Sequence, residues 1–130
     1  MESFNSRRAL AFRSWGWQAG KRIAARLISE RMLHAPHVLD LEVASVFRRQ
    51  VALGALDADG VAQTLALHQN LRIMRHPHYP YLDRIWNLRQ NFSAYDACYI
   101  ALTQALGATL LTRDKALASA RLQRGNVEVI

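Results

Sequence analysis

The feature of this sequence that most constrains its fold is the alternation of strand-like and helix-like segments from Gly20 to the end of the chain. The strand-like segments are short apolar or alternating runs, whereas the helix-like segments repeat apolar residues every three to four positions. Strands separated by helices pair in parallel through right-handed crossovers, and helices then cover both faces of the sheet. The alternation therefore predicts an α/β fold in three layers, α/β/α, around a central, mostly parallel sheet.

The pattern assigns each segment to a strand or a helix. The expected strands cover residues 32–35, 71–75, 109–112 and 127–130. The expected helices cover residues 21–31, 40–53, 57–69, 81–90, 93–106 and 114–122. Ser93 is a favoured N-cap and Gly107 is a favoured residue just past a helix end, so both ends of the fifth helix are marked. The chain is long enough for one hydrophobic core, and a single domain over residues 1–130 is expected.

The composition and the apolar runs of the sequence indicate the cellular compartment of the protein. Cys98 is the only cysteine, so the chain has no disulfide framework, as is typical of a reducing cytoplasm. No apolar run reaches the roughly 18 residues that cross a bilayer. The first residues also lack the apolar stretch of a secretory signal. We therefore expect a cytoplasmic protein with no membrane association.

The chain is basic, with 17 Lys and Arg residues, 10 Asp and Glu residues and a net charge of +7. Much of the excess lies in residues 1–31. A basic excess favours a polyanionic partner such as RNA, because each neutralised phosphate releases counterions. A solvated positive face explains the same charge without any partner, so the charge alone leaves both explanations open.

Three carboxylates follow strands or begin helices in this pattern. Glu42 follows the strand at 32–35, Asp96 lies in the first turn of the fifth helix, and Asp114 follows the strand at 109–112. The carboxyl ends of parallel strands share one edge of a sheet, where such folds bind ligands. Carboxylates gathered there repel one another unless a cation compensates them, and Mg²⁺ takes oxygen ligands and activates water against phosphodiesters. The pattern predicts a Mg²⁺ site formed by these three acids.

Each of these acids also has a purely structural explanation. Ser93 and Asp96 have the spacing of a capping box, and Asp114 can cap the helix that follows it. Glu42 can be a solvated residue paired with Arg49. The prediction of a site therefore depends on three acids at corresponding ends of successive units.

Histidine pairs offer a competing metal site. His34 and His37 flank one proline at a strand exit, and His76 and His78 flank another. No HExxH motif is present, and no cysteine accompanies either pair. We therefore interpret these residues as loop histidines.

Three segments resemble PIN-domain toxins of the VapC type. Residues 33–43, LHAPHVLDLEV, resemble the segment that carries the second acid of that family. Residues 94–102, AYDACYIAL, resemble its YDAxYxALA helix, and residues 110–114, LLTRD, resemble its LLTxD strand exit. The last two motifs at this spacing are specific, and the resemblance extends over about residues 18–130.

The resemblance implies a PIN-like fold and a ribonuclease that cuts structured RNA, such as tRNA or rRNA, with Mg²⁺ or Mn²⁺. It also implies a homodimer that a VapB-like antitoxin inhibits. Position by position, Glu42, Asp96 and Asp114 match acidic, metal-binding positions of the family, and Thr112 matches a polar neighbour in its catalytic site. Asp96 is the best candidate for a metal ligand.

The start of the chain departs from the family pattern. Members of the family open with a short apolar strand that ends in an aspartate. Here residues 1–17 are atypical, the first strand is altered, and Asn5 or Ser6 stands at the position of the aspartate. Neither side chain carries a negative charge, so a weaker metal site is expected. Arg7 or Arg8 could instead pair with the remaining carboxylates.

We predict that the chain is a toxin endoribonuclease with the acidic site described above, and we keep two other functions as alternatives to this first one. The second is a catalytically impaired PIN domain that binds an antitoxin or RNA, which the missing aspartate favours. The third is a PIN nuclease that acts on DNA, or in RNA processing outside any toxin–antitoxin pair.

Overall fold

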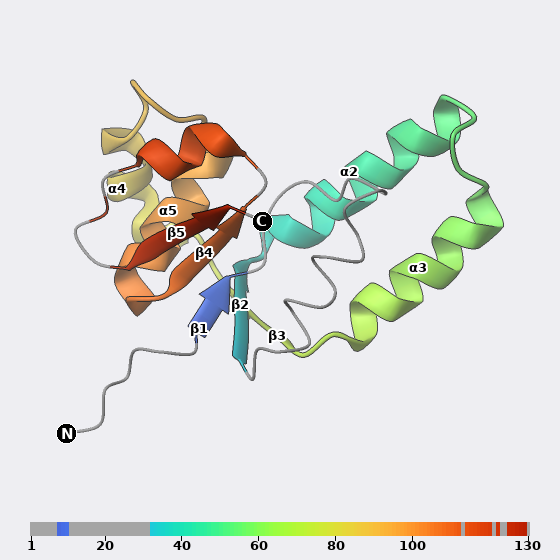
Figure 1. Ribbon diagram of the computed structural model, residues 1–130, viewed down its shortest axis with the longest axis horizontal. Helices are drawn as coiled ribbons and strands as arrows, with labels where there is room; N and C mark the ends of the chain where they lie inside the picture. The colour runs from blue at the N-terminus through green and yellow to red at the C-terminus, as the bar shows by residue number, and fades with distance from the viewer. Residues whose placement is uncertain (1–7, 11–31, 113, 121, 123–124, 130) are drawn as a thin grey trace.

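The centre of the molecule is a five-stranded parallel sheet. The structure is a computed structural model, and it describes residues 8–10, 32–112, 114–120, 122 and 125–129. The strand order is β3-β2-β1-β4-β5, and each pair of neighbours is parallel (Figure 1). The predicted α/β class with a parallel sheet is therefore confirmed. The strands are β1 (Arg8–Leu10), β2 (Met32–Pro36), β3 (Ile73–His76), β4 (Thr109–Thr112) and β5 (Asn126–Val129).

The helices of the described segments differ in how they meet this sheet. Two of them form a hairpin that extends to one side of the sheet in Figure 1, and these are α2 (Val38–Ala52) and α3 (Ala58–Asn70). The others lie closer to the strands and are α4 (Leu82–Asn87), α5 (Ala94–Leu106) and the 3-10 turns η2 (Tyr79–Tyr81) and η3 (Lys115–Ser119). The helix expected over residues 21–31 lies outside the described residues.

Helix α5 is the central helix of the fold, and both of its predicted ends are confirmed. Ser93 is its N-cap, and Gly107 ends it in the left-handed conformation with φ 60°. Every residue from Ala97 to Thr103 is buried, and the helix contacts β1, β2 and β4. A helix that leads into a parallel strand runs opposite to it, so the start of α5 lies at the carboxyl edge of the sheet.

Three predicted boundaries are corrected by the structure. The strand expected at 71–75 is β3, which ends at His76 because His76 pairs in register with Pro36 of β2. The helix expected at 81–90 is divided into η2 and the short α4, after which the chain turns through residues 88–91. The helix expected at 114–122 is only the 3-10 turn η3.

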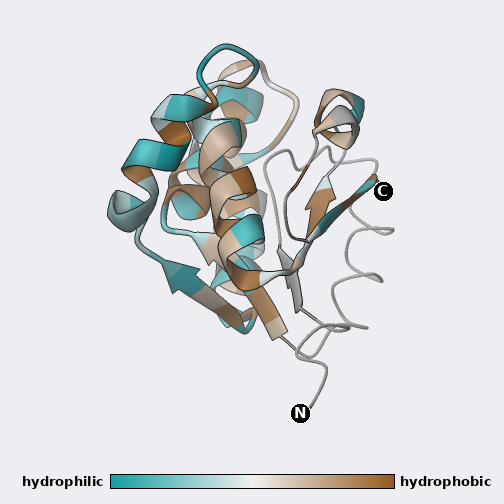
Figure 2. Cartoon of the chain, turned by 90° about the vertical axis from the view of Figure 1, so that its left-hand side faces the viewer, coloured by the Kyte–Doolittle hydropathy of each residue, from teal (hydrophilic) through white to brown (hydrophobic). Residues whose placement is uncertain are grey.

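The hydrophobic core lies between the sheet and the helices. Figure 2 shows that the helices carry hydrophilic residues on one side and hydrophobic residues on the other, as amphipathic helices do. No helix within the described ranges combines the length and apolar character needed to cross a membrane. The core includes Leu33, Leu39, Val43, Tyr99, Leu102, Leu110 and Leu111.

Candidate acidic site

Asp96 is placed by the cap of α5. The hydroxyl oxygen of Ser93 accepts a hydrogen bond from the backbone N–H of Asp96 at 3.1 Å. This bond satisfies one of the donors that a helix start leaves open, so the capping interpretation is correct for the backbone. The carboxylate of Asp96 is half-buried and lines a pocket. The same helix turn thus carries both a structural cap and a carboxylate that lines the pocket.

Asp114 is placed by the end of β4. Thr112 is fully buried at the last position of that strand, and its hydroxyl oxygen accepts a hydrogen bond from the backbone N–H of Asp114 at 3.0 Å. The Oδ1 atom of Asp114 in turn accepts from the backbone N–H of Ala116 at 2.8 Å and caps η3. Thr112 therefore fixes the backbone that carries Asp114, and the side chain of Asp114 remains exposed.

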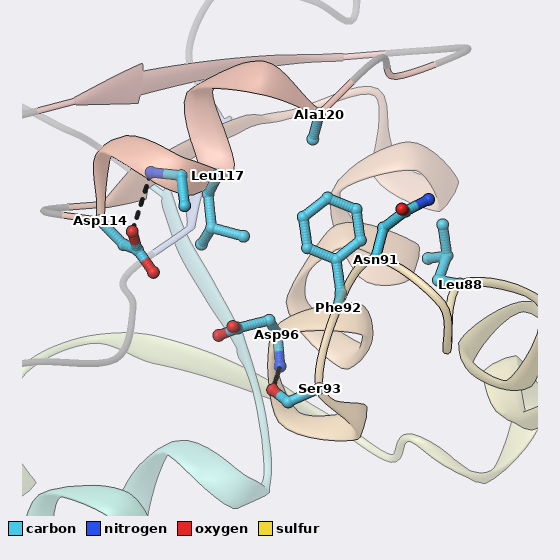
Figure 3. Close-up of a pocket in the computed structure, with 9 residues that line it drawn as sticks. Leu88, Asn91, Phe92, Ser93, Asp96, Asp114, Leu117 and Ala120 are labelled. Carbon is cyan, nitrogen blue, oxygen red and sulfur yellow. Dashed lines mark hydrogen bonds between the residues drawn. The ribbon is translucent and has the colours of Figure 1, made fainter.

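These two acids line one pocket of about 590 Å³. Figure 3 shows their carboxylates at one end of the pocket and Phe92, Leu88 and Asn91 at the other. Asp96 comes from the start of α5 and Asp114 from just beyond β4, so the carboxyl edge of the sheet brings together residues that lie far apart in the sequence. The remaining lining residues are Ser93, Ala116, Leu117 and Ala120.

Glu42 lies on α2, outside this pocket. Its Oε1 atom accepts a hydrogen bond from the hydroxyl of Tyr99 at 2.8 Å, which connects α2 to α5. Glu42 and the exposed Tyr95 line a second pocket of about 690 Å³. Within the part of the chain that the structure describes, no three His, Cys, Asp or Glu side chains form a group that could hold a metal ion. Two of the three predicted acids therefore share a pocket, whereas Glu42 lines the second pocket and is bonded to α5 through Tyr99.

The donor chemistry of the pocket nevertheless fits Mg²⁺ or Mn²⁺. Mg²⁺ commonly binds through one or two carboxylates, keeps several waters and takes its other ligands from a phosphate. Asp96 and Asp114 supply two carboxylates of this kind from different elements. Both side chains retain contact with solvent, so hydrated ions can enter.

The sequence analysis missed an ion-pair network at the start of α2. The Asp40 carboxylate accepts from Arg75 Nε at 2.5 Å and from Arg75 Nη2 at 2.9 Å, and His68 Nε2 lies 2.7 Å from Asp40 Oδ1. The Arg75 guanidinium lowers the pKa of Asp40 from 3.8 to about 2, with His68 assisting and burial opposing. The network joins α2, α3 and β3. No local sequence pattern predicts this network, because His68 and Arg75 lie 28 and 35 residues from Asp40.

The interpretation of His34 and His76 as loop histidines is wrong. Both lie in strands, and His34 is only 2% exposed. His34 Nδ1 lies 2.8 Å from His76 Nε2, because the two strands are neighbours and both residues face the same side of the sheet. His37 and His78 are exposed, as loop residues are.

Cys98 is a core residue of α5. The thiol is 5% exposed, and burial raises its pKa to about 11, with the negative charge of Glu42 adding to the shift. A thiol that stays protonated at neutral pH is a poor nucleophile and a poor metal ligand.

The first described strand, β1 (Arg8–Leu10), begins after Asn5 and Ser6, the residues that stand where the family resemblance implies an aspartate. The missing carboxylate at the start of the chain therefore stays a prediction from the sequence. Asn5, Ser6, Arg7 and Ala11 lie outside the described residues.

The fold and the pocket together define an α/β domain with paired carboxylates at the carboxyl edge of a parallel sheet. The sequence profile of the PIN domain matches residues 12–122 of the chain. The chain therefore belongs to the PIN-domain family.

Relatives within this family carry VapC names. VapC ribonuclease Mb0985 of Mycobacterium bovis is 41% identical over 91 residues, which cover 70% of this chain and 72% of that protein. Ribonuclease VapC1 of Mycobacterium tuberculosis is 40% identical over 95 residues, covering 72% of this chain and 71% of that protein. Ribonuclease VapC12 of the same species is 31% identical over 113 residues, or 86% of each chain. The resemblance to VapC-like proteins is confirmed.

Proposed function

We propose that this chain is a Mg²⁺-dependent endoribonuclease and the toxin component of a VapBC-type toxin–antitoxin system. The observation that carries the proposal is the pocket at the carboxyl edge of the sheet, which Asp96 and Asp114 line together. The ribonuclease names of the relatives supply the substrate class.

In the proposed reaction, Asp96 would be the main ligand of the cation, and Glu42 and Asp114 would complete the cation site and position the attacking water. Once bound, the cation neutralises charge on the scissile phosphate and lowers the pKa of a bound water. Thr112 keeps the backbone of Asp114 in place through its buried hydroxyl. The apolar end of the pocket, with Phe92 and Leu88, gives a surface against which a base of the RNA can pack.

The proposal extends to the partners of the toxin. Structured RNA, such as tRNA or rRNA, is the proposed substrate, and the net charge of +7 supports binding to phosphates. A VapB-like antitoxin is the proposed inhibitor, a homodimer the proposed assembly, and the cytoplasm the proposed location. Mn²⁺ is expected to replace Mg²⁺.

The test is cleavage of labelled tRNA and rRNA by the purified chain, with Mg²⁺ and with a chelator. Cleavage that requires the metal and disappears in Asp96→Asn would support the proposal, because asparagine keeps the size of the side chain but loses its charge. Asp83→Asn is the matched control, since Asp83 is an exposed acid in the first turn of α4. Metal-independent cleavage, or full activity of Asp96→Asn, would contradict the proposal.

The second candidate is a PIN domain with impaired catalysis that binds an antitoxin or RNA. The specific observation in its favour is the start of the sequence, where Asn5 or Ser6 stands at the position that the family resemblance assigns to an aspartate. Under this alternative the chain binds RNA or a VapB-like protein with normal affinity and leaves RNA intact at all metal concentrations.

A further inference from the structure

Tyr99 is a buried tyrosine whose hydroxyl reaches the neighbouring helix. Its side chain is 1% exposed in the core cluster, and its hydroxyl donates to Glu42 Oε1 at 2.8 Å. A buried tyrosine hydroxyl usually needs a hydrogen-bond partner, and here the partner is a carboxylate. The bond joins residues 57 positions apart, so only the packing of α2 against α5 creates it.

The position of Tyr99 on α5 connects it to the acidic pocket. Asp96 and Tyr99 are three residues apart, so they lie on the same face of the helix in successive turns. Asp96 lines the pocket with Asp114, and Tyr99 holds Glu42. The charge of Glu42 also contributes to the raised pKa of Cys98, which lies between Asp96 and Tyr99 in the sequence of α5. One helix thus carries one acid and fixes the position of another.

The chemistry of the bond suits a carboxylate that must remain available to a cation. A phenol is an uncharged donor, so it orients Glu42 without adding a positive charge. A carboxylate has two oxygens and about four acceptor positions, so the hydrogen bond from Tyr99 occupies only part of its acceptor capacity.

We infer that Tyr99 is a positioning residue of the nuclease site, which holds the Glu42 carboxylate at the side of α5 that carries Asp96. This inference rests on the proposed metal-dependent function. The aromatic ring of Tyr99 contributes to the core, whereas its hydroxyl sets the rotamer and direction of Glu42. Removing the hydroxyl should therefore weaken metal binding while the fold stays intact.

The experiment measures Mn²⁺ affinity by isothermal titration for the wild type and Tyr99→Phe. Phenylalanine fills the same volume and removes only the hydroxyl. Thr103→Val is the matched control, because Thr103 is also fully buried on α5 and its hydroxyl donates to the backbone oxygen of Tyr99 at 2.8 Å, so the change leaves the Tyr99 hydroxyl in place. The same titration then compares the Glu42→Ala variant with the double variant that carries both Glu42→Ala and Tyr99→Phe. Thermal unfolding without metal checks that each variant is folded.

The expected result is a Kd for Mn²⁺ about tenfold higher in Tyr99→Phe, in the range found for partners that orient metal ligands. Thr103→Val should bind as the wild type does, and Tyr99→Phe should have no further effect once Glu42 is alanine. In RNA cleavage, Tyr99→Phe should lower kcat and leave KM for RNA unchanged, because the residue does not touch the RNA.

The outcomes separate the two proposals. Wild-type affinity in Tyr99→Phe, an equal loss in Thr103→Val, or a full Tyr99→Phe effect in the Glu42→Ala background overturns the role of Tyr99 and leaves the proposed function intact. A wild type that neither binds Mn²⁺ nor cleaves RNA overturns the proposed function, and the inference fails with it.

Discussion

Asp40 and Asp114 both follow parallel strands at the same edge of the sheet, but the two regions hold them in different ways. In the region of α2, α3 and β3, Asp40 is held by Arg75 and His68, and Arg75 lowers its pKa to about 2. In the region of β4, η3 and α5, Asp114 accepts from the backbone N–H of Ala116 and lines a pocket.

The difference separates an acid that joins secondary-structure elements from an acid that can bind a ligand. The charge of Asp40 is matched by a guanidinium, and the pair ties together three elements that the chain visits in sequence. A backbone N–H is a dipole, so it orients the carboxylate of Asp114 without cancelling its charge. Proximity to the carboxyl edge alone therefore does not identify a functional acid, because the partners of each acid decide what it can do.

The largest effect is expected in the core that both regions share. Leu102 on α5 and Leu39 on α2 are 1% and 0% exposed and belong to one cluster. Each change to alanine removes buried atoms and leaves a cavity, so each should lower the free energy of unfolding by roughly 2–5 kcal/mol. Urea denaturation measures both. A loss under about 0.5 kcal/mol at only one of the two would show that its region does not share the core.

Activity should separate the two acidic regions. Asp96→Asn should reduce metal-dependent RNA cleavage by at least about a hundredfold, since even partners that only orient metal ligands are worth 10–100-fold. Its unfolding midpoint should stay near the wild-type value, because the Ser93 cap to the backbone is retained. Asp40→Asn should instead keep most of the RNA-cleavage activity and lower the unfolding midpoint. Single-turnover cleavage and thermal unfolding together check this contrast, and equal losses of activity in both variants would contradict it.

Asp40→Asn should lower the free energy of unfolding at pH 7 by about 1 kcal/mol, because the carboxylate is 40% exposed and solvent screens the ion pair. Asparagine cannot form the charge-assisted bonds to Arg75. Chemical denaturation at neutral pH measures the loss, and Asp57→Asn serves as the control for an exposed acid on the same helical hairpin. Identical stability of Asp40→Asn and the wild type would show that the network adds nothing to the fold.

The same ion pair predicts a pH dependence. The pKa of Asp40 is lowered from 3.8 to about 2 in the folded chain, so the carboxylate stabilises the fold above pH 3.8. As the pH falls from 3.8 towards 2, the Asp40 carboxylate of the folded chain takes up a proton, and its ion pair with Arg75 is lost. The stability difference between the wild type and Asp40→Asn should shrink from pH 4 to pH 2. A difference that stays constant over this range would contradict the lowered pKa.

The smallest effect is expected at Thr112. Thr112→Val keeps the shape of the buried side chain and removes the acceptor for the backbone N–H of Asp114. The expected cost is about 0.5–1 kcal/mol of stability, the size of one hydrogen bond. Cleavage should fall more than this stability loss explains, because Asp114 loses a fixed backbone. Thr103→Val provides the comparison on the α5 side, where a similar stability loss should leave cleavage unchanged.

Much of the fold could be read from local patterns. The Ser93 and Gly107 signals placed both ends of α5, and the apolar run at Thr109–Thr112 placed β4. Local patterns failed where pairing partners decide the outcome. β1 is only three residues long and shows no apolar run, yet it is the central strand because β2 and β4 both pair with it. His76 belongs to β3 only because Pro36 lies opposite it.

The candidate site shows the same division. The sequence by itself determined which residue types stand after each strand, and thus the choice of Glu42, Asp96, Asp114 and Thr112 as candidates. Only the tertiary structure decided that Asp96 and Asp114 share a pocket, that Tyr99 holds Glu42, and that Arg75 and His68 hold Asp40. The physical reason is range. Caps and hydrophobic periodicity act within a few residues, whereas hydrogen bonds and charge pairs across the sheet edge join residues tens of positions apart and depend on how the helices pack.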